Sequence, residues 1–228
     1  MNQIELKALA KINLGLDVLG RRENGYHDVR MVMQSIYLYD EVKIEKTEAP
    51  GITLASNLSF LPTGEGNIAY KAAKLLMEEF HIPAGVRITL NKHIPVAAGL
   101  AGGSSNAAAV LFGMNRMFRL GLKQEELMAR GVRLGADVPY CIMRGTVLAE
   151  GIGEELSVLP AMPKCTVLIA KPPVSVSTKV VYEALDAKEI AEHPDIDGTL
   201  DALDKHSLKQ VAACIGNVLE DVTIPMHP

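Results

Sequence analysis

The stretch Pro95-Val-Ala-Ala-Gly-Leu-Ala-Gly-Gly-Ser-Ser-Asn-Ala-Ala108 carries more structural information than any other part of this 228-residue chain. Its glycines, Gly99, Gly102 and Gly103, allow the backbone to approach a ligand closely and to adopt positive φ angles. Two serines then open an alanine-rich segment that is typical of a helix and is predicted to end near Phe118. Because free amides and the positive end of the helix dipole meet at such a start, the pattern predicts an anion site, most simply for phosphate.

The same loop has a plainer interpretation, a glycine-rich turn whose helix is capped by serine. The chain contains no Gly-x-x-x-x-Gly-Lys-Ser/Thr motif, which excludes a Walker A loop. No Gly-x-Gly-x-x-Gly follows a predicted strand, so neither a Rossmann nor a protein-kinase loop is supported. A phosphate loop in this chain therefore belongs to a different class.

The N-terminal segment has the clearest periodicity. Apolar residues occupy the even positions from Ile4 to Val18, which predicts a long strand with one buried face. Lys11 and Asn13 lie on its polar side. A tight turn is predicted to follow at Asn24-Gly25, because both residues tolerate positive φ angles.

Hydrophobic periods of two and of 3.6 residues alternate along the rest of the chain. The predicted strands are residues 29–38, 41–46, 52–54, 86–90, 145–149 and 166–170. The predicted helices are residues 67–80, 104–118, 123–134, a segment from 137, 178–185 and 207–219. Asn67 occupies the N-cap position of the first of these helices.

Composition places the chain among globular proteins and excludes several function classes. It is 48% apolar and 22% charged, with a formal net charge of −4, which argues against a general nucleic-acid binder. Three widely spaced cysteines support neither a zinc ribbon nor a disulfide framework and predict buried thiols in a reducing compartment. Without a long apolar run or a signal-peptide core, we expect a soluble cytoplasmic protein with no membrane partner.

Two prolines, Pro160 and Pro163, indicate a domain boundary. We therefore expect an N-terminal domain over residues 1–160 and a second domain over residues 161–228. The second segment holds one clear predicted strand, and one strand cannot form a sheet. We expect the second domain to be incomplete or to depend on the first.

Several motifs together resemble the GHMP kinases, a family named after galactokinase, homoserine, mevalonate and phosphomevalonate kinases. The glycine-rich loop resembles the second signature of this family, and Ala10-Lys-Ile-Asn-Leu14 resembles the first. Three further segments resemble the branch that acts on a diphosphocytidyl derivative of methylerythritol. They are Asn24-Gly-Tyr-His-Asp28, Met33-Gln-Ser-Ile36 and Leu134-Gly-Ala-Asp-Val-Pro139.

This resemblance implies an α+β two-domain GHMP kinase fold. The N-terminal domain would resemble ribosomal protein S5 domain 2, and an incomplete ferredoxin-like C-terminal domain would follow. The implied reaction is transfer of the γ-phosphoryl group of ATP to the 2-hydroxyl of 4-diphosphocytidyl-2-C-methyl-D-erythritol (CDP-methylerythritol). The nucleotide would carry Mg²⁺, and the protein would be a monomer or weak homodimer.

The resemblance also assigns catalytic roles to Lys11 and Asp137. Lys11 would stabilise developing charge and help activate the acceptor hydroxyl, and Asp137 would take its proton. Each residue has a plainer interpretation, because an isolated lysine is usually solvated and aspartate is a favoured helix N-cap. A lysine and an aspartate beside a phosphate loop nevertheless suffice for phosphoryl transfer, which depends mainly on positioning and charge neutralisation.

The remaining residues implied by the resemblance divide between ATP and the second substrate. The predicted ATP-binding residues are Asn67, Lys92, Pro95, Val96, Ala97, Ala98, Gly99, Leu100, Ala101, Gly102, Gly103, Ser104 and Ser105. The predicted substrate-binding residues are Asn13, Tyr26, His27 and Tyr182, with His27 on the cytosine base. Two alternatives stay open here: Asn67 as a plain helix cap, and Tyr182 as a packing residue. The other histidines lack metal-ligand spacing, so no metal held by the protein is predicted.

The chain departs from the family in one respect. Nothing in it matches a third glycine-rich signature, roughly Ser-Gly-Ser-Gly-Pro-Thr, and the last glycine is Gly216. We therefore expect a truncated or divergent member. The alternatives are another GHMP kinase of the homoserine or mevalonate type, a non-catalytic nucleotide-binding remnant, and an S5-like RNA-binding module, which the acidic balance disfavours.

Overall fold

A computed structural model describes residues 1–172, 174, 176, 178–186, 190 and 192–227. The chain divides into two compact units. Unit 1 comprises Met1–Lys11, Ile36–Val96 and Leu100–Met143, and unit 2 comprises Ile12–Ser35, Ala97–Gly99 and Arg144–Pro228. Two long strands, β1 (Gln3–Arg21) and β2 (His27–Thr47), contribute residues to both units.

The sheet of unit 1 has the strand order β3-β4-β2-β1. Strand β4 (Gly85–Asn91) is antiparallel to β2, with Ile88 opposite Ile44. Strand β3 (Ile52–Ser56) runs parallel to β4 at the edge. Alternate residues of β4 are buried, as expected for a strand with one face on a core.

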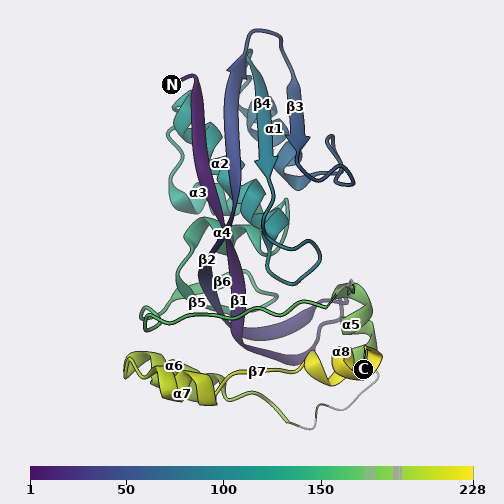
Figure 1. The fold of residues 1–228 in the computed structure, drawn as a ribbon, viewed down its shortest axis with the longest axis vertical. Coiled ribbons are helices and arrows are strands. Elements are labelled where there is room, and N and C mark those ends of the chain that lie inside the picture. The colour runs from purple at the N-terminus through teal and green to yellow at the C-terminus, as the bar shows by residue number, and fades with distance from the viewer. Residues whose placement is uncertain (173, 175, 177, 187–189, 191, 228) are drawn as a thin grey trace. The chain divides into compact units, whose positions relative to one another are not determined.

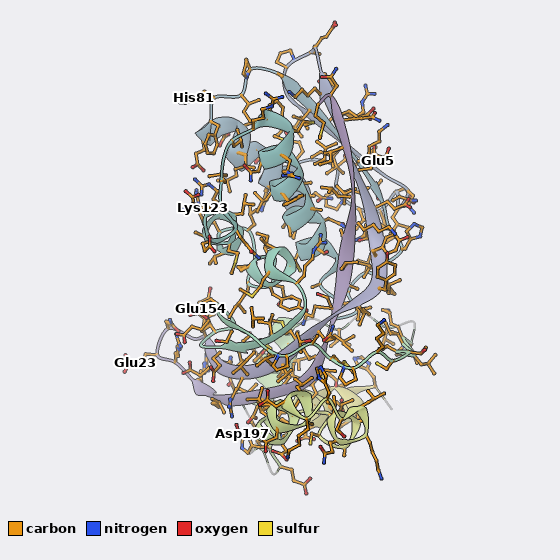
Figure 2. All side chains as sticks on the ribbon, turned by 90° about the vertical axis from the view of Figure 1, so that its left-hand side faces the viewer. Glu5, Glu23, His81, Lys123, Glu154 and Asp197 are labelled. Atoms are coloured by element: carbon orange, nitrogen blue, oxygen red, sulfur yellow. The ribbon has the colours of Figure 1, made fainter. Side chains whose placement is uncertain are left out.

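Four helices belong to unit 1, and the two longest, α1 and α2, lie against one face of its strands (Figure 1). They are α1 (Ile68–Glu79), α2 (Gly102–Phe118), α3 (Gln124–Val132) and α4 (Val138–Met143). Figure 2 shows side chains filling the space between helices and strands, with His81 and Lys123 on the helical side and Glu5 on the strand side. Gly113 allows α2 to approach β2 closely, because an added Cβ would lie 2.5 Å from Ile44 Cδ1.

Unit 2 is built on the other parts of β1 and β2, with the strand order β7-β1-β2-β5-β6. Its strands are β5 (Thr146–Glu150), β6 (Glu155–Val158) and the short β7 (Gly216–Asn217), which runs parallel to β1. Its helices are α5 (Thr178–Leu185), α6 (Ile196–Asp204), α7 (Leu208–Ala213) and α8 (Glu220–Met226). Leu14, Val32, Leu148, Ile196 and Leu203 form its core.

The structure confirms most of the predicted elements. The alternation from Ile4 to Val18 is strand β1, and Asn67 caps α1 through its side-chain oxygen. The two strands predicted over 29–38 and 41–46 are one continuous strand, β2. The prediction of one buried face for β1 is too simple, because residues 14–18 are all buried and both faces are therefore covered there.

Three predictions in the second half are wrong. Residues 166–170 belong to no strand, and Leu168 is 93% exposed, so an apolar run alone did not place this segment in the sheet. The segment predicted as one helix over 207–219 contains the short helix α7 followed by strand β7, and α8 begins only after it, at Glu220. Of the three free cysteines, Cys141 is buried but Cys165 is exposed, which corrects the expectation of buried thiols.

None of the helices in the described part of the chain is both long and apolar enough to cross a lipid bilayer.

Candidate active site

The glycine-rich loop leads into helix α2, which begins at Gly102, two residues earlier than the serines suggest. The N-cap residue is Ala101, whose methyl group cannot accept a hydrogen bond, so the first amides of the helix are left for other acceptors. Gly103 is exposed and Ser104 is half-buried. The start of α2 therefore has the amides, the dipole and the access that an anion site requires.

The loop backbone holds alanines in a conformation that normally favours glycine. The φ angles of Ala97 and Ala101 are 53° and 54°, and that of Gly99 is 69°. The left-handed conformation costs a non-glycine residue about 1–2 kcal/mol. It persists only where the surroundings determine the backbone, so we infer that this loop is held in one shape.

Lys11 lies beside this loop. Its backbone N–H donates to the carbonyl of Leu100 (3.1 Å), and Ser105 Oγ donates to the carbonyl of Leu9 (2.7 Å). Lys11 is only 6% exposed, so the interpretation as a solvated lysine is wrong. A cation buried beside a loop that has the features of an anion site could act on phosphate charge.

Asp137 precedes α4, and its carbonyl accepts the first-turn bond from the Cys141 N–H (3.0 Å). The same segment approaches the loop, since a Cβ added at Gly135 would lie 4.0 Å from Ser104 Oγ. Asp137 is half-buried. Unit 1 thus brings the Lys11 backbone and the Asp137 segment to one loop, although 126 residues of sequence separate the two residues.

The other two predicted nucleotide residues also border the loop. Asn67 caps α1, accepting from the Ala69 N–H and donating to the Pro62 carbonyl (both 2.9 Å), so the plain capping role is present. The start of α1 reaches the loop, because a Cβ added at Gly103 would lie 3.4 Å from Ile68 Cδ1. Lys92 is buried and forms an ion pair with Asp40.

Unit 2 contains a pocket of about 360 Å³ whose lining includes Arg21, His27, Asp186 and His193. This is within the range of small-molecule pockets. The rings of His27 and Tyr182 lie with centroids 4.8 Å apart and planes tilted by 33°. The structure therefore brings together two residues that are 155 positions apart and that the sequence assigned to one substrate.

His27 has an acidic partner that sequence reasoning missed. Its Nε2 lies 2.6 Å from Asp186 Oδ1, and Arg21 reaches the other oxygen of the same carboxylate (3.2 Å). Hydrogen bonding to His27, with a smaller contribution from Arg21, lowers the pKa of Asp186 below its ordinary value. The available signal was its spacing, four residues after Tyr182 on one helical face.

A second histidine of the pocket is also paired with an acid. His193 Nδ1 lies 2.7 Å from Asp17 Oδ1, and Asp17 is buried. Asp17 shares its odd position in β1 with Lys11 and Asn13, a signal that the sequence carried and that was not used.

The other two predicted substrate residues are less confined. Tyr26 is 60% exposed, and its N–H donates to Asn24 Oδ1 within the turn that joins β1 to β2. Asn13 is half-buried on β1 in unit 2. Among the described residues no group of three or more His, Cys, Asp or Glu side chains is arranged to hold a metal ion.

This fold and this loop define the class of the GHMP kinases, and the model of the GHMP kinases N terminal domain matches residues 67–145. The 4-diphosphocytidyl-2-C-methyl-D-erythritol kinase of Lachnospira eligens is 58% identical over the whole of this chain, which covers 79% of that protein. The kinase of the same name from Lachnoclostridium phytofermentans is also 58% identical over the whole chain and 78% covered. The chain belongs to the 4-diphosphocytidyl-2-C-methyl-D-erythritol kinase family.

A solved structure supports the same assignment. The crystal structure of a 4-(cytidine 5'-diphospho)-2C-methyl-D-erythritol kinase matches 99% of this chain and 79% of its own with a TM-score of 0.78 and 32% identity. The predicted GHMP kinase fold is thereby confirmed, as is the prediction of an ATP-dependent kinase.

Proposed function

We propose that this chain transfers the γ-phosphoryl group of ATP to the 2-hydroxyl of CDP-methylerythritol, a step of the non-mevalonate route to isoprenoid precursors. The observation that supports the proposal is the convergence of the Lys11 backbone and the Asp137 segment on the residues that lead into α2 in unit 1. Relatives that are 48–58% identical over 98–100% of the chain bear the name of this kinase, which favours it over a homoserine or mevalonate kinase.

On the nucleotide side, the loop from Pro95 to Ser105 would hold the phosphates of ATP through its backbone amides, with Asn67 and Lys92 flanking it. Mg²⁺ would enter with the nucleotide and neutralise charge on the phosphates. Ser104 is the better placed of the two serines to face the nucleotide, because the hydroxyl of the buried Ser105 already bonds to the Leu9 carbonyl.

At the reacting centre, Asp137 would accept the proton of the 2-hydroxyl and so make the oxygen a better nucleophile. Lys11 would stabilise the negative charge that develops on the transferring phosphoryl group. The oxygen attacks the γ-phosphorus directly and ADP leaves, so no covalent enzyme intermediate is needed.

On the acceptor side, the pocket of unit 2 would hold the cytidine. His27 can hydrogen-bond the base, and Tyr182 and Tyr26 offer aromatic faces to it. Asn13 would contact the methylerythritol part. We further propose domains over residues 1–160 and 161–228, and a cytoplasmic monomer or weak homodimer that binds neither nucleic acid nor membranes.

A coupled ADP-release assay with ATP, Mg²⁺ and CDP-methylerythritol tests the proposal. We expect Lys11→Ala and Asp137→Asn each to lower kcat by about 10²–10⁴-fold. Lys7→Ala is the matched control for Lys11, because Lys7 is exposed on the same side of β1, and the exposed Asp204→Asn is the control for Asp137.

Two results would contradict the proposal in different ways. Binding of CDP and ATP without turnover would indicate a non-catalytic nucleotide-binding protein. Absence of both turnover and CDP binding would exclude the diphosphocytidyl substrate for this chain.

A further inference from the structure

A buried polar network lies next to the phosphate loop. Asp40 on β2, Lys92 after β4 and Asn106 on α2 contribute its side chains, and Asp40 is 0% exposed. The ammonium of Lys92 is ion-paired with Asp40 and donates to Asn106 Oδ1 (2.8 Å). Asn106 Nδ2 completes the ring by donating to Asp40 Oδ2 (2.9 Å).

The same network fixes the backbone that enters the loop. The second oxygen of Asp40 accepts the N–H groups of His93 (2.7 Å) and Ile94 (2.8 Å). On the preceding residue, Asn57 accepts from the Lys92 N–H (2.8 Å) and donates to the Lys92 carbonyl (3.1 Å). Three consecutive residues before Pro95 are therefore held by side chains from elsewhere in unit 1.

The network also reaches the end of the loop. A Cβ added at Gly102 would lie 3.1 Å from Lys92 Nζ, so the ammonium packs directly against the first residue of α2. Asn106 belongs to the second turn of the same helix. One charged group thus contacts both the strand side and the helix side of the anion site.

Stability alone does not account for this arrangement. Burying two charges costs several kcal/mol per ion, and well-packed apolar side chains often serve stability equally well. A lysine has three donors, and two of those of Lys92 have partners inside the protein. Its side chain is 4% exposed, which leaves little room to reach a nucleotide.

We propose that Asp40, Lys92 and Asn106 are positioning residues that hold the phosphate loop in its anion-binding shape. Lys92 then affects ATP binding by holding the loop and does not contact ATP itself. Asp40 is as important for ATP binding as Lys92. This inference rests on the proposed function, because it concerns the same ATP site.

A double-mutant cycle tests it, with Asp40→Asn, Lys92→Met and the two combined. Each single variant leaves an unpaired buried charge or amide and is expected to raise KM for ATP about tenfold or more. KM for CDP-methylerythritol is expected to stay within about twofold, because its pocket is not part of the network. The double variant, which removes both charges, is expected to recover a large part of the loss.

Asn57→Ala is a second variant for the case that the charge variants do not fold. The exposed Asn57 side chain hydrogen-bonds to the same backbone, and its removal leaves no buried charge unpaired. This variant is expected to raise KM for ATP about threefold while lowering the melting temperature by only a few degrees. Calorimetric binding of ADP with Mg²⁺ is the second readout. It reports on the loop even if the chain shows no turnover, so failure of the proposed function and of this inference can be told apart.

Two outcomes would overturn the inference. If Lys92→Met and the double variant are equally impaired while Asp40→Asn binds ADP normally, Lys92 is a direct nucleotide ligand. If the variants raise both KM values together, the network has a general structural role and does not position the loop.

Discussion

The start of α2 in unit 1, proposed to bind phosphate, and the pocket of unit 2 differ in how their charged groups are buried. Under the loop, the side chains of the Asp40–Lys92 pair are 0% and 4% exposed. In the pocket, the side chains of His27 and Asp186 are 11% and 23% exposed, and Arg21 is largely in solvent. Under the proposed function, the loop is supported by a pair that ATP would not contact, whereas the pocket would present its polar groups to the cytidine.

From this difference we propose how the two sites would select their ligands. Buried pairs are screened little and set geometry, which would suit the loop to one invariant group, a phosphate. Partly exposed pairs contribute little energy, so we expect cytidine binding to depend more on the rings of His27 and Tyr182 than on fixed charges. Substitutions in the two regions are therefore expected to separate ATP binding from cytidine binding.

The largest effect is expected from Gly102→Val. The new side chain would meet Lys92 Nζ and Ile94 Cγ2, both already 3.1 Å from an added Cβ, and would displace the first amides of α2. A displacement of about 1 Å can cost about 100-fold in rate, and we expect kcat/KM for ATP to fall by about that factor. Steady-state kinetics with Gly64→Val as control, a site with open space around it, checks this. If kcat/KM for ATP falls equally in Gly102→Val and Gly64→Val, the start of α2 is no more important for ATP than an open surface site.

A smaller effect is expected from Tyr182→Ala, because the Tyr182 ring lies beside that of the pocket residue His27. Stacking of a base on an aromatic ring contributes about 1–3 kcal/mol, so CDP binding should weaken about tenfold. ADP binding should not change. Calorimetric titration of both nucleotides measures the two affinities, and the exposed Tyr37→Ala serves as control. If CDP binding is unchanged, Tyr182 is a packing residue.

The smallest effect is expected from Asp186→Asn, about threefold weaker CDP binding at neutral pH, as for an exposed ion pair. The folded-state pKa of Asp186 lies below its ordinary value because of His27, so the carboxylate keeps its negative charge to a lower pH than a free aspartate does. Its contribution to CDP binding is therefore lost only as pH falls through the lowered pKa. In a titration series the difference between wild type and variant should shrink only below the ordinary pKa of an aspartate, about 3.9. A difference that does not shrink at any acidic pH would exclude the carboxylate as its source.

Local patterns were predictable from the sequence, and distant pairings were not. The alternation that became β1 and the Asn67 cap depend on neighbouring residues, so periodicity was sufficient to find them. Lys11 and the loop were found as separate motifs, because each matched a short pattern. Nothing in the sequence marked Asp40, whose importance comes from lying beside Lys92, 52 residues later.

The errors had a common physical cause. Residues 166–170 have the composition of a strand, but a strand also needs a neighbour to pair with, which composition does not report. In the 207–219 segment the break at β7 depends on Gly216 pairing with Gly15 of β1. Asp186 was missed for a related reason, since its partners Arg21 and His27 come from the opposite end of the chain.

The exposed segment around Leu168 has a practical consequence for work with this protein. Residues 165–170 are Cys-Thr-Val-Leu-Ile-Ala, an uncharged run of high β-propensity outside the sheet, with Val167 and Ile169 also exposed. Such runs are sites of intermolecular strand addition. We therefore expect this short stretch to be a site of self-association in concentrated solution, and the exposed thiol of Cys165 makes a reducing buffer advisable.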